Sequence, residues 1–228
     1  FFGWQIPEEQ IFPFDVLVQL GTLAAVILYF RRDVFRIAGA FVRGVIARRP
    51  FDEADSRLAW LLILATLPAG IIGLLVKDIV EAAFQSVAAT ALFLFATAAL
   101  LVMAEWLGKQ QRAFEHVDWK DALWIGFFQA LSIFPGISRS GATISGGVFR
   151  HLDRSAAARF SFLMSIPVML AAGLVSVVDL LDVPGLLSFL PVLLAGVITS
   201  VVVGYFSIHW LLSFLRKRSL LAFALYCA

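Results

Sequence analysis

The residues best suited to chemistry lie in one polar interruption of an apolar chain, residues 129–147, which read QALSIFPGISRSGATISGG. A cation inside a membrane costs roughly 3 kcal/mol on insertion scales, so Arg139 is by default a functional-site hypothesis. A guanidinium can grip two phosphate oxygens at once, and the N–H groups at a helix N-terminus also favour anions. We therefore predict that Arg139 binds an anion, with phosphate the best chemical match.

The residues around Arg139 predict a helix that is broken and then restarted. Pro135 and Gly136 should end the incoming half-helix, because proline and glycine disrupt helical geometry. Ser138 or Ser140 should cap the outgoing one. Small residues also permit tight helix packing, and that alternative explains the glycines and serines. It does not explain the arginine, so an anion site is favoured.

Composition identifies a membrane protein. Apolar residues make up 61% of the chain and charged residues 15%, with a mean hydropathy of +0.92. Soluble domains are about 45–50% apolar and about 25% charged. The length of 228 residues allows roughly six or seven spanning or re-entrant segments. The single cysteine, Cys227, excludes an internal disulfide and a cysteine metal site, and no nucleic-acid-binding motif is present.

Apolar stretches predict an all-α, polytopic membrane bundle that forms a single transmembrane domain over residues 1–228. A short loop over residues 77–86 should join the spans 58–76 and 87–107. Pro167 should interrupt the span 160–181. The arginine-rich segment 31–57 predicts an amphipathic helix on the membrane surface. The predicted spans are 14–30, 58–76, 87–107, 160–181 and 186–215.

The positions of the basic residues predict a re-entrant hairpin over residues 121–149. Cytoplasmic loops are enriched in Lys and Arg, and the segments at both ends of 121–149 are basic. Both ends should therefore lie on the same side of the membrane. We predict a helix at 121–134, a break at 135–136 and a second half-helix from near Ser140. Of 18 basic residues, only Lys77 and Arg139 then fall away from the inner face.

The central motif resembles the signature of the bacterial undecaprenyl-diphosphate phosphatase family. The resemblance rests on residues 135–143, PGISRSGAT, with two further collinear stretches, FDVLVQLG at 14–21 and FSFLMSIP at 160–167. It covers essentially the whole chain. It implies an enzyme of the bacterial plasma membrane that hydrolyses undecaprenyl diphosphate to the monophosphate and phosphate. Roles in cell-wall synthesis and bacitracin resistance follow from the same resemblance.

The resemblance also implies roles for individual residues. Arg139 matches the family's essential arginine, and we assign catalytic roles to Arg139 and Ser138. Two glutamines, Gln19 and Gln129, could equally form hydrogen bonds between helices. The residues predicted to bind substrate are Gly136, Ser140, Gly141, Thr143, Gln129 and Gln19.

The family is built as an inverted repeat, and this sequence shows one half of it. The family's earlier Glu-x-x-x-Glu motif is not present in residues 1–228. We therefore interpret the chain as a fragment with one of two facing half-sites, and predict that it is inactive alone. The nucleophile and the general acid or base are not identified by this sequence.

Two other functions fit the same motif. A transporter or lipid flippase could use the anion site to carry its ligand, since half-helices also build transporter sites. A membrane scaffold would instead pair Arg139 with an internal carboxylate. A diphosphate substrate is compatible with Mg²⁺ or Ca²⁺, although the sequence fixes no metal ligand. The expected partners are a polyprenyl diphosphate and membrane lipids, and a homodimer is compatible with the sequence.

Overall fold

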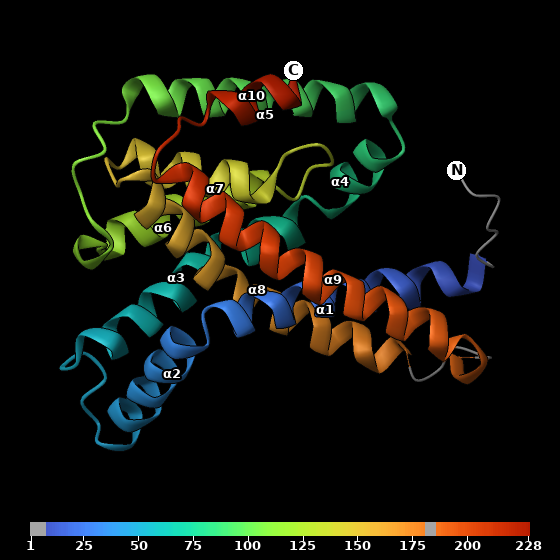
Figure 1. The fold of residues 1–228 in the computed structure, drawn as a ribbon, viewed down its shortest axis with the longest axis horizontal. Coiled ribbons are helices and arrows are strands. Elements are labelled where there is room, and N and C mark those ends of the chain that lie inside the picture. The colour runs from blue at the N-terminus through green and yellow to red at the C-terminus, as the bar shows by residue number, and fades with distance from the viewer. Residues whose placement is uncertain (1–7, 181–185) are drawn as a thin grey trace. The chain divides into compact units, whose positions relative to one another are not determined.

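The computed structural model describes residues 8–180 and 186–228, and every regular element in these ranges is a helix (Figure 1). The all-α prediction is therefore confirmed. In chain order the elements are α1 (Glu8–Tyr29), α2 (Arg31–Ile46), α3 (Ala54–Leu75), α4 (Lys77–Phe84), α5 (Val87–Leu107), the 3₁₀ turn η1 (Phe114–His116), α6 (Trp119–Leu131), α7 (Arg139–Phe149), α8 (Arg154–Leu180), α9 (Leu186–Leu215) and α10 (Leu221–Cys227).

Three of these helices are long and apolar enough to cross a membrane: Ala54–Leu75, Val87–Leu107 and Pro191–Leu215. They coincide with the second, third and last of the predicted spans. A shorter apolar helix, Leu17–Tyr29, lies within the first predicted span. The described helices thus support the prediction that this is a membrane protein.

The described residues form two compact units. Unit 1 draws on residues 1–34 and 165–211, and unit 2 comprises residues 35–164 and 212–228. The sequence-based prediction of one transmembrane domain is not tested by this division and stays a prediction.

Unit 1 holds α1 against α9 through polar contacts between otherwise apolar helices. The Ser200 hydroxyl donates a hydrogen bond to the Val18 carbonyl oxygen at 2.8 Å. At the C-terminal end of α1, the Tyr29 hydroxyl lies 3.3 Å from His209 Nδ1. Such bonds between helices favour a fixed register where the surrounding side chains are all apolar.

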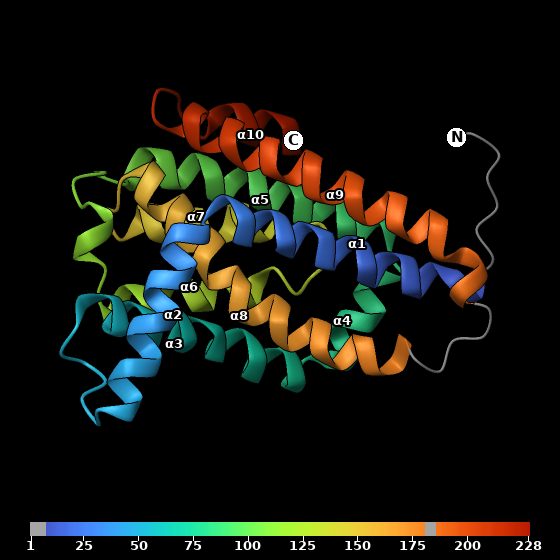
Figure 2. The ribbon, with the colours of Figure 1, turned by 60° about the horizontal axis from the view of Figure 1, so that its bottom comes forward.

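Unit 2 packs α6 between α3 and α7, and α7 against α5 (Figure 1, Figure 2). Gly126 allows the close approach of α6 to α3, because a Cβ there would lie 2.5 Å from the Ala65 carbonyl oxygen. α10 runs alongside α5 in both views. These helices bury residues 141–148 of α7 in the interior of unit 2.

Two local predictions are wrong. Residues 77–84 form the eight-residue helix α4 in place of a loop. Val80 is buried there, and Lys77 and Glu81 pair at 3.7 Å across one helical turn. Pro167 does not interrupt its span, because α8 continues through it from residue 154 to 180. A helix tolerates a proline when neighbouring groups satisfy the freed carbonyl.

Candidate functional site

The predicted hairpin is present as two helices that meet at their outer ends. α6 begins at Trp119 and α7 ends at Phe149, and Asp121 joins these ends. Arg150 Nε donates to Asp121 Oδ1 at 2.7 Å, and Arg112 Nη2 donates to Asp121 Oδ2 at 2.7 Å. Since the two ends of the hairpin lie together, residues 121–149 do not form a single crossing of the unit. This geometry supports the re-entrant interpretation.

Asp121 is a buried charge that is held by several donors. Its side chain has no exposed surface, whereas those of Arg112 and Arg150 are 29% and 36% exposed. Asp118 and Asp121 also form a capping box at the start of α6. Burial raises the pKa of the Asp121 carboxyl, but hydrogen bonds from Arg112, the Asp118 backbone and Arg150 outweigh it and hold the pKa below its ordinary value. The carboxylate is therefore stable in its ionised form at the base of the hairpin.

The tip of the hairpin rests on Thr97, at the middle of α5. The Thr97 hydroxyl accepts a hydrogen bond from Ser138 N at 3.1 Å and lies 3.3 Å from the Gly136 carbonyl oxygen. Thr97 has no exposed surface. Because α5 is a candidate membrane span, contact with its midpoint places the tip halfway along that span.

Gly136 is required at the tip by two independent observations. Its backbone φ is +91°, a value that residues other than glycine rarely adopt. A Cβ at this position would also overlap the Thr90 carbonyl oxygen of α5. The break spans residues 132–138, longer than the predicted 135–136, because α6 ends at Leu131 and α7 begins at Arg139.

Replacing Gly136 with alanine is expected to lower the free energy of unfolding by about 2 kcal/mol and to displace the tip. Thermal unfolding of the purified full-length protein in detergent measures this change. Gly70 provides the matched control, since a Cβ there meets no atom within 4 Å. A Gly136→Ala variant as stable as Gly70→Ala would contradict a strained tip.

The N-terminus of α7 presents the groups predicted to bind an anion. Ser138 is the N-cap, and its hydroxyl accepts a hydrogen bond from Gly141 N at 3.1 Å. The capping prediction is confirmed for Ser138, and the Ser140 hydroxyl lies 3.4 Å from the Ser138 hydroxyl. Arg139, the first residue of α7, is exposed. The first N–H groups of a helix have no carbonyl partner within it, so this turn favours a negatively charged ligand.

Two other predicted substrate-binding residues, Thr143 and Gly141, pack α7 against neighbouring helices. The Thr143 hydroxyl is 2.6 Å from the Ser161 hydroxyl and donates to the Arg139 carbonyl oxygen at 2.8 Å. Thr143 is 1% exposed. A Cβ at Gly141 would lie 3.1 Å from Thr97 Cγ2, so this glycine allows contact with α5. Direct binding of substrate by Thr143 and Gly141 stays a prediction.

The two glutamines differ in their surroundings. Gln129 is 3% exposed on α6, and neither its amide oxygen nor its amide nitrogen has a hydrogen-bond partner in the described part of the chain. Gln19 is exposed on α1 of unit 1. A buried amide without partners is costly, which supports the prediction that Gln129 meets a polar ligand. A shared site for Gln19 and Arg139 stays a prediction.

Sequence reasoning missed the residues that fix the hairpin in place. Thr97 carries a hydroxyl in the middle of an apolar span, and this polar group was the available sign of a contact with another segment. The pairing of Asp121 with Arg112 and Arg150 had no signal in spacing, because the partners are separated by 9 and 29 residues. Glu105, similarly, pairs with Arg154 and accepts a hydrogen bond from Leu220 N at 3.1 Å.

Metal-binding groups are not gathered at the hairpin. Within residues 8–180 and 186–228, no three His, Cys, Asp or Glu side chains are placed to hold a metal ion. A requirement for Mg²⁺ or Ca²⁺ therefore stays a prediction, which turnover measured with and without a chelator would test.

The fold and the hairpin define an all-α membrane protein with an arginine at the start of a braced half-helix. The chain belongs to the bacitracin resistance protein BacA family, whose sequence model matches residues 1–228. It is 40% identical over 225 residues to an undecaprenyl-diphosphatase of Myxococcus xanthus, covering 99% of this chain and 74% of that protein. It is 41% identical to an undecaprenyl-diphosphatase of Chloroherpeton thalassium, covering 98% and 81%. It is 42% identical to undecaprenyl-diphosphatase 1 of Corynebacterium jeikeium, covering 93% and 76%.

Proposed function

We propose that this protein is a hydrolase that converts undecaprenyl diphosphate and water to undecaprenyl phosphate and inorganic phosphate. The observation that carries the proposal is the N-terminal turn of α7, where Arg139 follows the Ser138 cap at the tip of a hairpin braced on Thr97. Family membership and relatives that carry the name undecaprenyl-diphosphatase support the choice of substrate.

The chemistry assigned to these residues is neutralisation of charge. When water attacks the terminal phosphorus, the P–O bond to the inner phosphate breaks, and the leaving oxygen keeps the electron pair. Arg139 and the first N–H groups of α7 would stabilise the added negative charge on the phosphate oxygens. Ser138 keeps that turn in position by accepting the Gly141 N–H. The phosphate product then leaves from the same turn.

We also propose that the protein spans the bacterial plasma membrane several times, with residues 121–149 entering from one side only. The candidate spans and the joined ends of the hairpin support this arrangement. A site at mid-span depth suits a substrate whose diphosphate is attached to a membrane-embedded chain. Polyprenyl diphosphate and membrane lipids are the proposed partners.

A phosphate-release assay and a lipid-transport assay together distinguish a hydrolase from a flippase that binds the same ligand. Purified full-length protein is expected to release one phosphate from each undecaprenyl diphosphate, measured by a colorimetric assay and by mass spectrometry of the lipid product. The same protein in liposomes should not move labelled undecaprenyl phosphate between leaflets. Movement of the lipid without phosphate release would show a flippase and contradict the proposal.

A further inference from the structure

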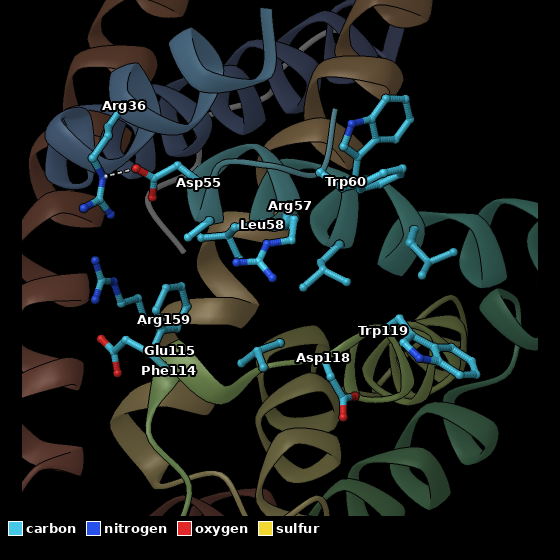
Figure 3. Close-up of a pocket in the computed structure, with 15 residues that line it drawn as sticks. Arg36, Asp55, Arg57, Leu58, Trp60, Phe114, Glu115, Asp118, Trp119 and Arg159 are labelled. Atoms are coloured by element: carbon cyan, nitrogen blue, oxygen red, sulfur yellow. Dashed lines mark ion pairs between the residues drawn. The ribbon is translucent and has the colours of Figure 1, made fainter. Parts of the chain in front are cut away.

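A second site candidate lies in unit 2, away from the hairpin tip. A cavity of about 870 Å³ separates the start of α3 from residues 114–119, and Arg36 of α2 and Arg159 of α8 also line it (Figure 3). None of the residues predicted to bind the diphosphate lines this cavity. Its volume is within the range of small-molecule sites, about 300–1,000 Å³.

Most charged groups in this cavity are already engaged within unit 2. Arg36 Nε lies 3.3 Å from Asp55 Oδ2. The Arg159 guanidinium stacks over the Phe114 ring, with 4.3 Å from Cζ to the ring centroid. Asp118 caps α6 and lies 3.8 Å from Arg112. These contacts leave one cation and one anion to account for.

The remaining pair is Arg57 of α3 and Glu115 of η1. Neither side chain has an ion pair or hydrogen bond among the residues that the structure describes. Figure 3 shows Arg57 pointing into the space between α3 and residues 114–118, and Glu115 at the edge of the cavity below Arg159, with its carboxylate directed away from Arg57. Both side chains are exposed and line the same open cavity without pairing with each other, an arrangement that leaves room for a ligand with both signs of charge.

The cavity also lies at one end of a candidate membrane span. The first turns of α3, from Ala54 to Leu64, form one wall of the cavity, and the candidate span of α3 begins at Ala54. Polar headgroups flank the hydrocarbon core at the ends of such spans. Two tryptophans line the cavity, Trp60 and Trp119, and tryptophan is enriched at this depth. Leucines of α3 supply an apolar wall beside the charges.

We propose that this cavity binds the headgroup of a zwitterionic aminophospholipid, with its phosphate on Arg57 and its ammonium on Glu115. A purely anionic headgroup would satisfy Arg57 but would face the unpaired Glu115 carboxylate, and like charges repel. A headgroup with both charges satisfies both residues. This lipid site is separate from the hydrolytic site and does not depend on the reaction proposed above.

Native mass spectrometry of the full-length protein with equal amounts of phosphatidylethanolamine and phosphatidylglycerol tests the site. The wild type is expected to retain phosphatidylethanolamine about tenfold more than phosphatidylglycerol. Arg57→Gln should reduce retention of both lipids about tenfold. Glu115→Gln should remove the preference by increasing retention of phosphatidylglycerol. Arg49→Gln, an exposed arginine of the same basic segment that does not line the cavity, is the control and should behave as the wild type.

Soluble phosphoethanolamine, which lacks acyl chains, distinguishes a lipid site from a site for a free metabolite. It should be retained far less than the lipid. Equal retention of the two lipids by the wild type, unchanged retention by Arg57→Gln, or tight binding of soluble phosphoethanolamine would each overturn the proposal. Undecaprenyl diphosphate hydrolysis should remain at the wild-type rate in Arg57→Gln and Glu115→Gln, so the two proposals can fail separately.

Discussion

Arg139→Ala is expected to lower the turnover of undecaprenyl diphosphate by about 10³-fold, while the protein remains folded. Arg139 begins α7 and is exposed, so its removal takes away a cation without opening a cavity in the core. Removing one preorganised group that stabilises transition-state charge typically costs about 10²–10³-fold in turnover, and an arginine acting on a phosphoryl group can contribute more. Phosphate release by purified full-length protein measures the loss.

Arg139→Lys and a distant arginine provide the comparison. Lysine keeps the charge but not the two-pronged guanidinium, so Arg139→Lys should remain at least tenfold below the wild type. Arg216→Ala removes an exposed cation from the turn after α9 and should leave turnover unchanged. Thermal unfolding should be the same for all these variants. Near-normal turnover in Arg139→Ala would exclude this residue from the chemistry.

Hydropathy and charge were sufficient to predict the long apolar helices, because a membrane imposes strong constraints on both. The predicted third span, 87–107, matches α5 residue for residue, and the basic segments at both ends of residues 121–149 indicated the hairpin. α4 was missed because eight residues are too few to identify a helix by periodicity, although its charged and apolar residues do follow a helical period. The predicted interruption at Pro167 was wrong because the rule that proline breaks a helix considers only local sequence. It leaves out neighbouring groups that can form hydrogen bonds with the backbone groups that the proline frees.

The central motif located the candidate site, but not how the site is held. The cap at Ser138 follows from local sequence, since a serine before a helix accepts a backbone N–H three residues later. The support from Thr97 is a contact across 41 residues, and no spacing rule relates these two positions. The Thr143 hydroxyl contacts Ser161, a neighbour that no spacing rule indicates, and its predicted contact with the substrate stays a prediction. Side-chain direction within a broken helix depends on packing that sequence periodicity does not define.

Asp121→Ala is expected to lower the free energy of unfolding by about 3 kcal/mol, because it leaves Arg112 and Arg150 without their shared carboxylate. Removing one partner of a buried ion pair typically costs about 3–5 kcal/mol. The lower value applies here because both guanidinium groups are partly exposed and solvent screens them. Thermal unfolding of the full-length protein in detergent should show a decrease of about 6–12 °C in Tm.

The same carboxylate gives the protein a defined response to acid. Since the pKa of Asp121 is below its ordinary value of 3.8 in the folded state, its contribution is complete above that value and is lost as the pH falls through the lowered folded pKa. The wild type should therefore lose stability below about pH 4, and Asp121→Asn should lack this part of the pH dependence. Asp118→Ala, which removes a cap but leaves both arginine contacts to Asp121, should cost only about 1 kcal/mol. If Asp121→Ala and Asp118→Ala unfold at the same temperature, Asp121 does not hold the two ends of the hairpin together.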